Sequence, residues 1–259
     1  MVRNLFPSRK RLWDRAVTRR RYLFVLGHMR SGSTLLVHLL ATNPNVAVLG
    51  ESHITYRRKG DLKKLSSWMG RELGERAGHA QLHVDKILHG KYLVPGLLAR
   101  LNVSVIYIVR EPVASIASMM SRFGPKWGWT MQDACRYYAR QLETLAGYVQ
   151  AHGGTAAAID YDDLVDRTEE SLALLERVTG VTGGFKAEYE VLPVVGRDRV
   201  GDSSSKIRRG RVVREKREPG ICIPEQVRRE LLESYRSLWR ILSEACLTLD
   251  GSLRRSVTA

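Results

Sequence analysis

Residues 27–34 (GHMRSGST) have the residue types and the spacing of a phosphate-binding loop. Their G-x-x-x-x-G frame follows the apolar run 22–26 and precedes the apolar pattern 33–40. Glycines permit positive φ angles and a close approach of the backbone to a ligand, and the amides and dipole that open a helix favour an anion. A glycine-rich turn without a ligand is the alternative, but these flanks favour phosphate binding. The residues that we expect to bind the phosphate are Arg30, Ser31, Gly32, Ser33 and Thr34.

The loop differs from that of nucleoside triphosphatases at one position. Ser33 stands where those proteins carry lysine, and the cation inside the loop is Arg30. Because that lysine contacts the β- and γ-phosphates and a hydroxyl binds magnesium, the change indicates a ligand without a triphosphate tail. We expect no metal. Three histidines lie close together in the sequence, but no carboxylate or cysteine accompanies them at the spacing of metal ligands. They are His79, His83 and His89.

A second anion site is indicated by Arg110, Ser118 and Arg122. Arg110 follows the apolar run 103–109, and the carboxyl ends of strands are where open α/β sheets bind ligands. Ser118 and Arg122 are four residues apart and share one face of a helix. The guanidinium fork suits a phosphate, so the three side chains together predict a phosphate clamp. The alternative for Arg122 is that it caps the C-terminal end of its helix.

Strand and helix patterns alternate along the chain, which predicts a parallel sheet with right-handed crossovers. The fold class is therefore α/β, a single domain with a central parallel sheet flanked by helices, like the P-loop nucleotide kinases. The predicted strands are 22–26, 46–49, 82–84, 103–109 and 155–159. The predicted helices are 33–40, 112–121, 131–151, 163–179 and a C-terminal amphipathic helix in 224–249, with part of 54–78 helical.

The domain predicted over residues 22–259 follows a basic lead-in, residues 1–21, and contains a basic loop, residues 181–217. The net charge is +15, which attracts polyanions but does not choose among nucleic acid, acidic lipid and a phosphorylated small molecule. No apolar stretch approaches the roughly 20 residues that span a bilayer, and no long apolar run follows the basic start. We expect no membrane span and no secretory signal. Peripheral contact with a membrane stays open, as does the oligomeric state.

The cysteines Cys135, Cys222 and Cys246 are widely spaced and odd in number. This argues against a disulfide framework and against a zinc site. A reducing compartment fits best, so we expect a cytoplasmic protein.

Both predicted anion sites resemble motifs of sulfotransferases that use 3′-phosphoadenosine 5′-phosphosulfate (PAPS), closest to tyrosylprotein, Golgi-type and related bacterial members. Residues 30–34 (RSGST) resemble that family's 5′-phosphosulfate loop, and residues 110–122 (REPVASIASMMSR) resemble its 3′-phosphate motif. The resemblance covers residues 22–179. It implies PAPS as cosubstrate, 3′-phosphoadenosine 5′-phosphate as product, and a hydroxyl-bearing acceptor. The late basic motif is only loosely similar; it would assign Lys206 and Arg208 to the nucleotide.

The same resemblance implies three catalytic residues. Glu51, in the segment GES, is similar to the family's general base, and Lys86, in Asp85-Lys86, to the lysine that contacts the sulfuryl oxygens. Arg30 would help to hold the leaving phosphate. Residues 159–165 (IDYDDLV) resemble a segment that closes the family's core, which we interpret as structural. The loop carries His28 where many relatives have proline.

Alternatives stay open for these side chains. Glu51 could pair with Arg57 or Arg58 at the surface, Lys86 could be a solvated lysine, and His53 is a rival base because imidazole titrates near neutrality. Lys206 and Arg208 could belong to a solvated loop.

The acceptor pocket is expected from residues 54–78, 123–129 and 181–201, where Trp127 and Trp129 line it or merely anchor a loop. The acceptor itself, whether a sugar, a lipid, a metabolite or a tyrosine, is not fixed by the sequence. Two other functions remain: a nucleotide-dependent kinase with an altered phosphate loop, and a basic nucleic-acid-binding protein. No recognition motif supports the second, so we expect no specific nucleic-acid partner.

Overall fold

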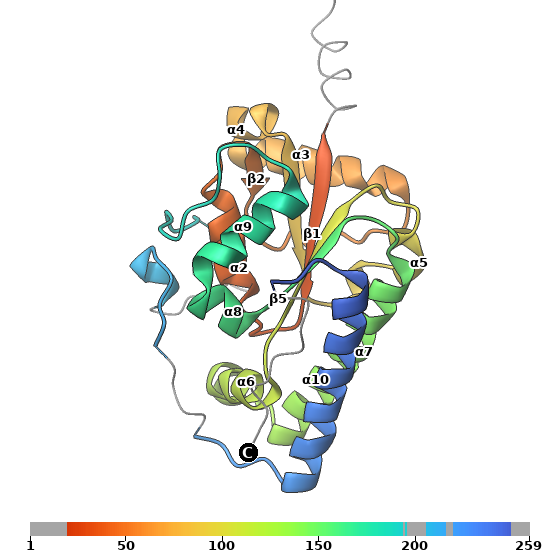
Figure 1. The fold of residues 1–259 in the computed structure, drawn as a ribbon, viewed down its shortest axis with the longest axis vertical. Helices are drawn as coiled ribbons and strands as arrows, with labels where there is room; N and C mark the ends of the chain where they lie inside the picture. The colour runs from red at the N-terminus through yellow and green to blue at the C-terminus, as the bar shows by residue number, and fades with distance from the viewer. Residues whose placement is uncertain (1–19, 194, 196–205, 216–219, 250–259) are drawn as a thin grey trace, which may run out of the picture.

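The computed structural model describes residues 20–193, 195, 206–215 and 220–249, and its centre is a five-stranded sheet (Figure 1). The spatial order is β2-β3-β1-β4-β5, and every neighbouring pair is parallel. The strands are β1 (Arg21–Gly27), β2 (Val46–Val48), β3 (Leu82–Ile87), β4 (Ser104–Val109) and β5 (Ala156–Asp160). The predicted fold class, a single α/β domain with a central parallel sheet, is confirmed.

Strand β1 occupies the middle of the sheet because its residues suit burial on both faces. Each of its residues after Arg21 is buried, and it pairs with β3 on one side and β4 on the other. The register places Val25 opposite Lys86 and opposite Ile106. The loop that follows β1 therefore begins at the centre of the sheet edge.

Helices cover both faces of the sheet. Figure 1 shows α2, α8 and α9 to the left of the strands and α5, α7 and α10 to the right. Helix α2 contacts β1 and β2, α9 contacts β4 and β5, and α7 contacts β1. The α-helices are α2 (Ser33–Ala41), α3 (Leu62–Leu73), α4 (Glu75–His79), α5 (Pro95–Leu98), α6 (Pro112–Trp127), α7 (Met131–Ala151), α8 (Tyr161–Asp166), α9 (Thr168–Thr179) and α10 (Glu225–Ala245). Three short 3₁₀ helices are η1 (Lys59–Asp61), η2 (Gly90–Tyr92) and η3 (Ile207–Arg209).

Three predicted boundaries were wrong. Strand β3 continues to Ile87 rather than ending at residue 84, because Asp85 and Lys86 still pair with β1 despite their charges. Helix α6 continues to Trp127, where Gly128 in the left-handed conformation ends it. The single helix predicted over 163–179 is two helices, since Arg167 leaves the helical conformation with φ −117° and ψ 49°.

The C-terminal helix predicted in 224–249 is present as α10, and it packs on α7 and against β5. Beyond it, Leu247 forms a bridge to Ala157 of β5. Most of the basic lead-in and about a third of the basic loop lie outside the described residues. No helix within the described ranges is long and apolar enough to cross a membrane.

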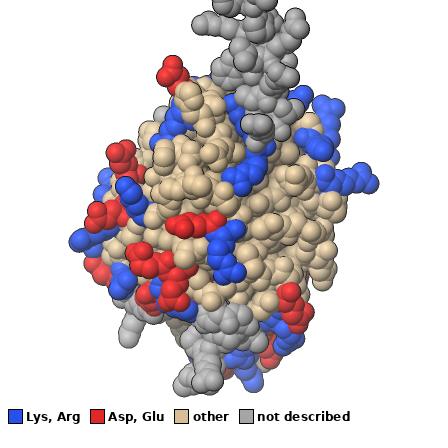
Figure 2. Space-filling model, turned by 45° about the horizontal axis from the view of Figure 1, so that its top comes forward, with Lys and Arg blue, Asp and Glu red and all other residues tan. Residues whose placement is uncertain are grey.

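The excess of basic residues does not form one continuous patch on the face drawn in Figure 2. There Lys and Arg side chains are interspersed with Asp and Glu, and a broad area carries neither. This face therefore gives no support to a nucleic-acid-binding surface, which needs clustered cations.

Candidate functional site

The predicted site residues come from segments that follow neighbouring strands. Because the strands are parallel, their carboxyl ends meet at one edge, where open α/β sheets bind ligands. The loop 27–32 follows β1, Arg110 follows β4, and Tyr161 follows β5. The segment 49–52 follows β2 in the same way.

The phosphate loop has the backbone conformation that its glycines require. Gly32 has a φ of 91° and Arg30 a φ of 66°, both in the left-handed region, and the Ser31 amide donates to the His28 carbonyl at 3.2 Å. A Cβ on Gly32 would lie 2.4 Å from Cδ2 of Tyr161, and one on Gly27 would lie 2.7 Å from the Ile108 carbonyl oxygen. Side chains at these two positions would collide with their neighbours, so the loop packs only with glycine there.

Two buried polar atoms at this loop have no hydrogen-bond partner among the described residues: Ser31 Oγ and Arg110 Nε. Such atoms cost free energy unless something satisfies them. The Arg110 guanidinium lies over the Tyr161 ring, 4.1 Å from its centroid, and its Nη1 donates to the Arg30 carbonyl at 3.5 Å. The loop and Arg110 thus form one region with two polar atoms that have no partner among the described residues, which is consistent with the predicted anion site.

The second predicted anion site is joined to the loop. Arg30 Nε donates to Ser118 Oγ of α6 at 2.8 Å. Arg122 is exposed one helical turn beyond Ser118, and α6 continues to Trp127. The alternative that Arg122 caps the end of its helix is therefore wrong. The structure joins Arg30 to Ser118 and to Arg110, whereas the spacing grouped Arg110 and Ser118 with Arg122; the phosphate clamp of those three stays a prediction.

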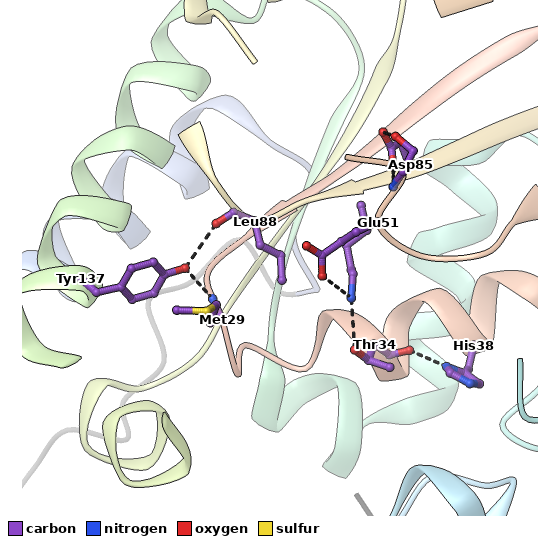
Figure 3. Close-up of polar contacts among 9 residues, drawn as sticks. Met29, Thr34, His38, Glu51, Asp85, Leu88 and Tyr137 are labelled. Atoms are coloured by element: carbon purple, nitrogen blue, oxygen red, sulfur yellow. Dashed lines mark hydrogen bonds and ion pairs between the residues drawn. The ribbon is translucent and has the colours of Figure 1, made fainter. Parts of the chain in front are cut away.

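Glu51 and Lys86 form a buried ion pair next to the loop (Figure 3). Lys86 Nζ lies 3.2 Å from Glu51 Oε1 and donates to Thr34 Oγ1 at 3.2 Å. The Lys86 side chain is 2% exposed and that of Glu51 is 13% exposed. The alternatives of a surface pair with Arg57 or Arg58 and of a solvated lysine are both wrong. The Arg58 guanidinium lies 3.8 Å from the Asp61 carboxylate instead.

Tyr137 of α7 is a site residue that the sequence analysis missed. Its hydroxyl accepts from the Met29 amide at 2.9 Å and donates to the Leu88 carbonyl at 3.3 Å (Figure 3). Burial raises the pKa of its hydroxyl, and the nearby Glu51 carboxylate raises it further. One tyrosine in a long helix carries no signal of such a role, because the contact arises only when α7 packs across β1.

His28 is a buried, uncharged part of the loop. Its Nδ1 donates to the Met29 carbonyl at 2.9 Å, and its Nε2 accepts from the Arg110 amide at 3.1 Å, which fixes the neutral tautomer. Burial lowers the pKa of His28 to about 4. The imidazole thereby ties the loop to the residue that follows β4.

The other histidines do not form a cluster. His53 is exposed, with a positive φ of 56° and its ring 5.5 Å from that of Tyr92. His83 is buried in β3 and hydrogen bonds to the Ala77 carbonyl, while His79 lies in α4. The part of the chain that the structure describes holds no group of three His, Cys, Asp or Glu side chains placed to share a metal ion.

The basic segment around Lys206 and Arg208 is held beside residues 187–189. Glu188 and Arg211 form an antiparallel bridge, the Tyr189 amide donates to the Gly210 carbonyl at 2.8 Å, and Lys206 Nζ donates to the Glu215 carbonyl. The contacts that we identify attach this segment to the chain after α9. A role of Lys206 and Arg208 in nucleotide binding stays a prediction.

The fold resembles a solved sulfotransferase structure. The sulfotransferase domain of the olefin synthase of Synechococcus PCC 7002 aligns with a TM-score of 0.52 and 16% sequence identity, over 83% of this chain and 94% of that domain. No protein-family model and no curated protein matches the chain. At this identity the likeness shows the fold alone, a single α/β domain with a central parallel sheet flanked by helices. The resemblance to tyrosylprotein and Golgi-type members is not supported beyond that fold.

Proposed function

We propose that the protein is a sulfotransferase that moves a sulfuryl group from PAPS to the hydroxyl of an acceptor. The observation that carries this proposal is the contact series from Glu51 through Lys86 to Thr34. It places a carboxylate, a buried lysine and a phosphate loop within hydrogen-bond reach of one another. In-line group transfer needs a base for the acceptor and cations for the charge on the transferred group and the leaving phosphate.

The donor would use both anion-binding regions. The amides and hydroxyls of residues 30–34 would hold the 5′-phosphosulfate, and Arg110, Ser118 and Arg122 the 3′-phosphate. The donors of Ser31 and Arg110 that have no partner among the described residues support this assignment, because a ligand would satisfy them. The serine in place of the loop lysine supports a ligand with no γ-phosphate. These residues need no metal for that binding.

The proposed reaction breaks one bond to sulfur and forms another. The acceptor oxygen attacks sulfur while Glu51 takes the hydroxyl proton, and the bond from sulfur to the 5′-phosphate oxygen breaks. Lys86, Arg30 and the loop amides stabilise the charge on the sulfuryl oxygens and on the leaving phosphate. The products are the sulfated acceptor, 3′-phosphoadenosine 5′-phosphate and a proton that Glu51 returns to water.

The acceptor would approach past aromatic side chains. The Trp129 ring lies 5.8 Å from that of Tyr137, whose hydroxyl contacts the loop, and the His89 ring lies 6.3 Å from the Tyr137 ring. The Glu51 carboxylate lies close enough to Tyr137 and His89 to act on both electrostatically, and these rings suit a hydroxyl carried on a ring. A sugar, a tyrosine and a cyclic metabolite all fit this description, as does a lipid whose headgroup is a sugar.

Transfer of labelled sulfate from PAPS to a panel of acceptors tests the proposal. Wild type should transfer the label, and Glu51→Gln should lose about 10²- to 10⁴-fold in rate, the usual contribution of a general base, while still binding 3′-phosphoadenosine 5′-phosphate. Glu143→Gln is the matched control, because it makes the same substitution at an exposed position of α7. Stabilisation by ATP with magnesium far beyond that by the bisphosphate would favour a kinase instead. Salt-sensitive binding of nucleic acid that survives Arg30→Ala, without any transfer, would favour the non-enzymatic alternative.

A further inference from the structure

Asp85 is a buried carboxylate that the proposed transfer chemistry does not use. It precedes Lys86 on β3, and successive side chains of a strand point to opposite faces of the sheet. Lys86 reaches Glu51 and Thr34 on one face. On the other, Asp85 Oδ1 accepts from the Ser52 amide at 3.0 Å, and Oδ2 accepts from Ser52 Oγ at 2.5 Å and from the Tyr56 hydroxyl at 2.7 Å.

These bonds hold the turn that carries Glu51. The Lys86 amide donates to the Gly50 carbonyl at 3.2 Å, so the residues on both sides of Glu51 are bonded to β3. Gly50 has a φ of 143°, which favours glycine, and Ser52 Oγ also accepts from the Ile54 amide at 3.1 Å. The turn therefore wraps around the end of β3, with the Glu51 side chain left on the Lys86 face. In Figure 3 Glu51 lies between Asp85 and Thr34.

We propose that Asp85 is a positioning residue, whose carboxylate fixes Ser52 and thereby holds the Glu51 carboxylate against Lys86 in the geometry that accepts the acceptor's proton. A buried carboxylate is costly unless donors satisfy it, and here three donors do so, two of them from the residue next to the base. The inference rests on the proposed sulfuryl transfer, because Asp85 is proposed to position Glu51, the base of that reaction.

The titration of Asp85 supports an effect of pH on this turn. Burial raises the pKa of Asp85 to about 6, the hydrogen bonds from Ser52 and Tyr56 lower it in part, and the charge of Glu51 raises it. The titratable groups that face it are Glu51 and Tyr56, with Lys86 next to it on β3; β1 contributes Phe24, whose ring packs on Tyr56. Below about pH 6 a proton occupies one of the two accepting oxygens, so the turn loses an acceptor.

Asp85→Asn is the direct test, because it removes the charge and keeps the shape. We expect kcat to fall by roughly 10- to 100-fold, the scale on which small misplacements of a reacting group act, with the KM for PAPS unchanged within about twofold. The fall in kcat of wild type on the acid side near pH 6 should be absent from the variant. Ser52→Ala should lower kcat in the same direction. Asp163→Asn is the matched control: Asp163 is also a buried carboxylate, but it lies on α8 and pairs with Arg167, so kcat should stay unchanged.

The outcomes separate this inference from the proposed function. Loss of transfer in Glu51→Gln together with wild-type kcat and pH profile in Asp85→Asn and Ser52→Ala overturns the positioning role and leaves the sulfotransferase standing. If wild type transfers no sulfate, amide hydrogen exchange decides: the Ser52 amide should exchange faster in Asp85→Asn than in Asp163→Asn, and equal exchange overturns the inference. If Asp85→Asn does not fold, kcat with its pH profile and amide hydrogen exchange are both measured on Ser52→Ala instead.

Discussion

Arg30 of the phosphate loop donates through Nε to Ser118 Oγ of α6 at 2.8 Å, across 88 positions of the sequence. Arg30 reaches this contact with a φ of 66°, and its carbonyl accepts from the Arg110 guanidinium. The two segments that the sequence separately predicts to bind anions are therefore in direct contact. A ligand with two phosphate-like groups would satisfy both ends, whereas a ligand with one would leave an end unused.

Loss of either arginine should weaken binding of 3′-phosphoadenosine 5′-phosphate. Hydrogen bonds to charged groups contribute about 1.5–3 kcal/mol, so Arg30→Ala and Arg110→Ala should each raise the dissociation constant by roughly 10- to 150-fold in calorimetry. Arg136→Ala is the control, since this exposed arginine pairs with Asp133 on α7. Affinities no lower than in this control would contradict the assignment of both residues.

Gly32→Ala should destabilise the protein, because the added Cβ would meet the Tyr161 ring at 2.4 Å and the backbone has a φ of 91°. We expect a loss of about 1–3 kcal/mol in the free energy of unfolding, measured with urea. Gly147→Ala is the matched control: it lies inside α7 with nothing within 4 Å of its Cβ position. Alanine there should add about 0.5–1 kcal/mol of stability. A Gly32→Ala variant as stable as wild type would contradict the tight packing of loop and ring.

The sheet could be predicted from the sequence because its strands are short apolar runs bounded by polar residues. The runs at 22–26 and 103–109 became β1 and β4, nearly to the residue. The end of β3 was predicted too early, because the charged side chains of Asp85 and Lys86 look like those of a loop after a strand. Their backbones nevertheless pair with β1. The break at Arg167 also escaped, since 163–179 keeps a helical pattern across it.

Proximity in the site could be predicted only where topology dictates it. Loop 27–34 and Arg110 follow adjacent parallel strands, so their meeting follows from the fold. The family resemblance singled out Glu51 and Lys86 separately, but their ion pair could not be predicted from the sequence. The roles of Tyr137 and Tyr161 could not be predicted. The sequence around a tyrosine in a helix or after a strand does not show whether its ring packs on the phosphate loop or elsewhere.

His28 should make the protein more stable as pH rises from about 4 to about 6.5. Its folded-state pKa is about 4 against 6.5 for an unperturbed imidazole, so in this window the unfolded chain binds more protons than the folded one. A shift of this size corresponds to roughly 3 kcal/mol across the window. The free energy of unfolding, measured with urea between pH 4 and 7, should therefore rise more steeply with pH in wild type than in His28→Gln.

Other groups titrate in that window, so the difference between the two proteins is the quantity to compare. Asp85 has a raised pKa of about 6 and acts with the opposite sign, since its folded form holds a proton longer, but it contributes equally to wild type and His28→Gln. His79→Gln, at an exposed position of α4, should run parallel to wild type. If His28→Gln runs parallel as well, the neutral histidine does not carry the linkage.

The aromatic residues at the end of α6 should set the preference for acceptors that carry a ring. Phe123 and Trp127 are stacked with ring centroids 4.5 Å apart, Trp127 is half exposed, and Trp129 lies 6.3 Å from it on the way to Tyr137. Aromatic contacts contribute about 0.5–1.5 kcal/mol each, so Trp127→Leu should raise the KM for a ring-bearing acceptor by roughly 2- to 10-fold. The KM for PAPS should not change, and neither should that for a small aliphatic alcohol. Trp239→Leu on α10, where the ring packs on Tyr235, is the aromatic control. An equal change in KM for ring-bearing and aliphatic acceptors would mean that Trp127 only anchors the end of the helix.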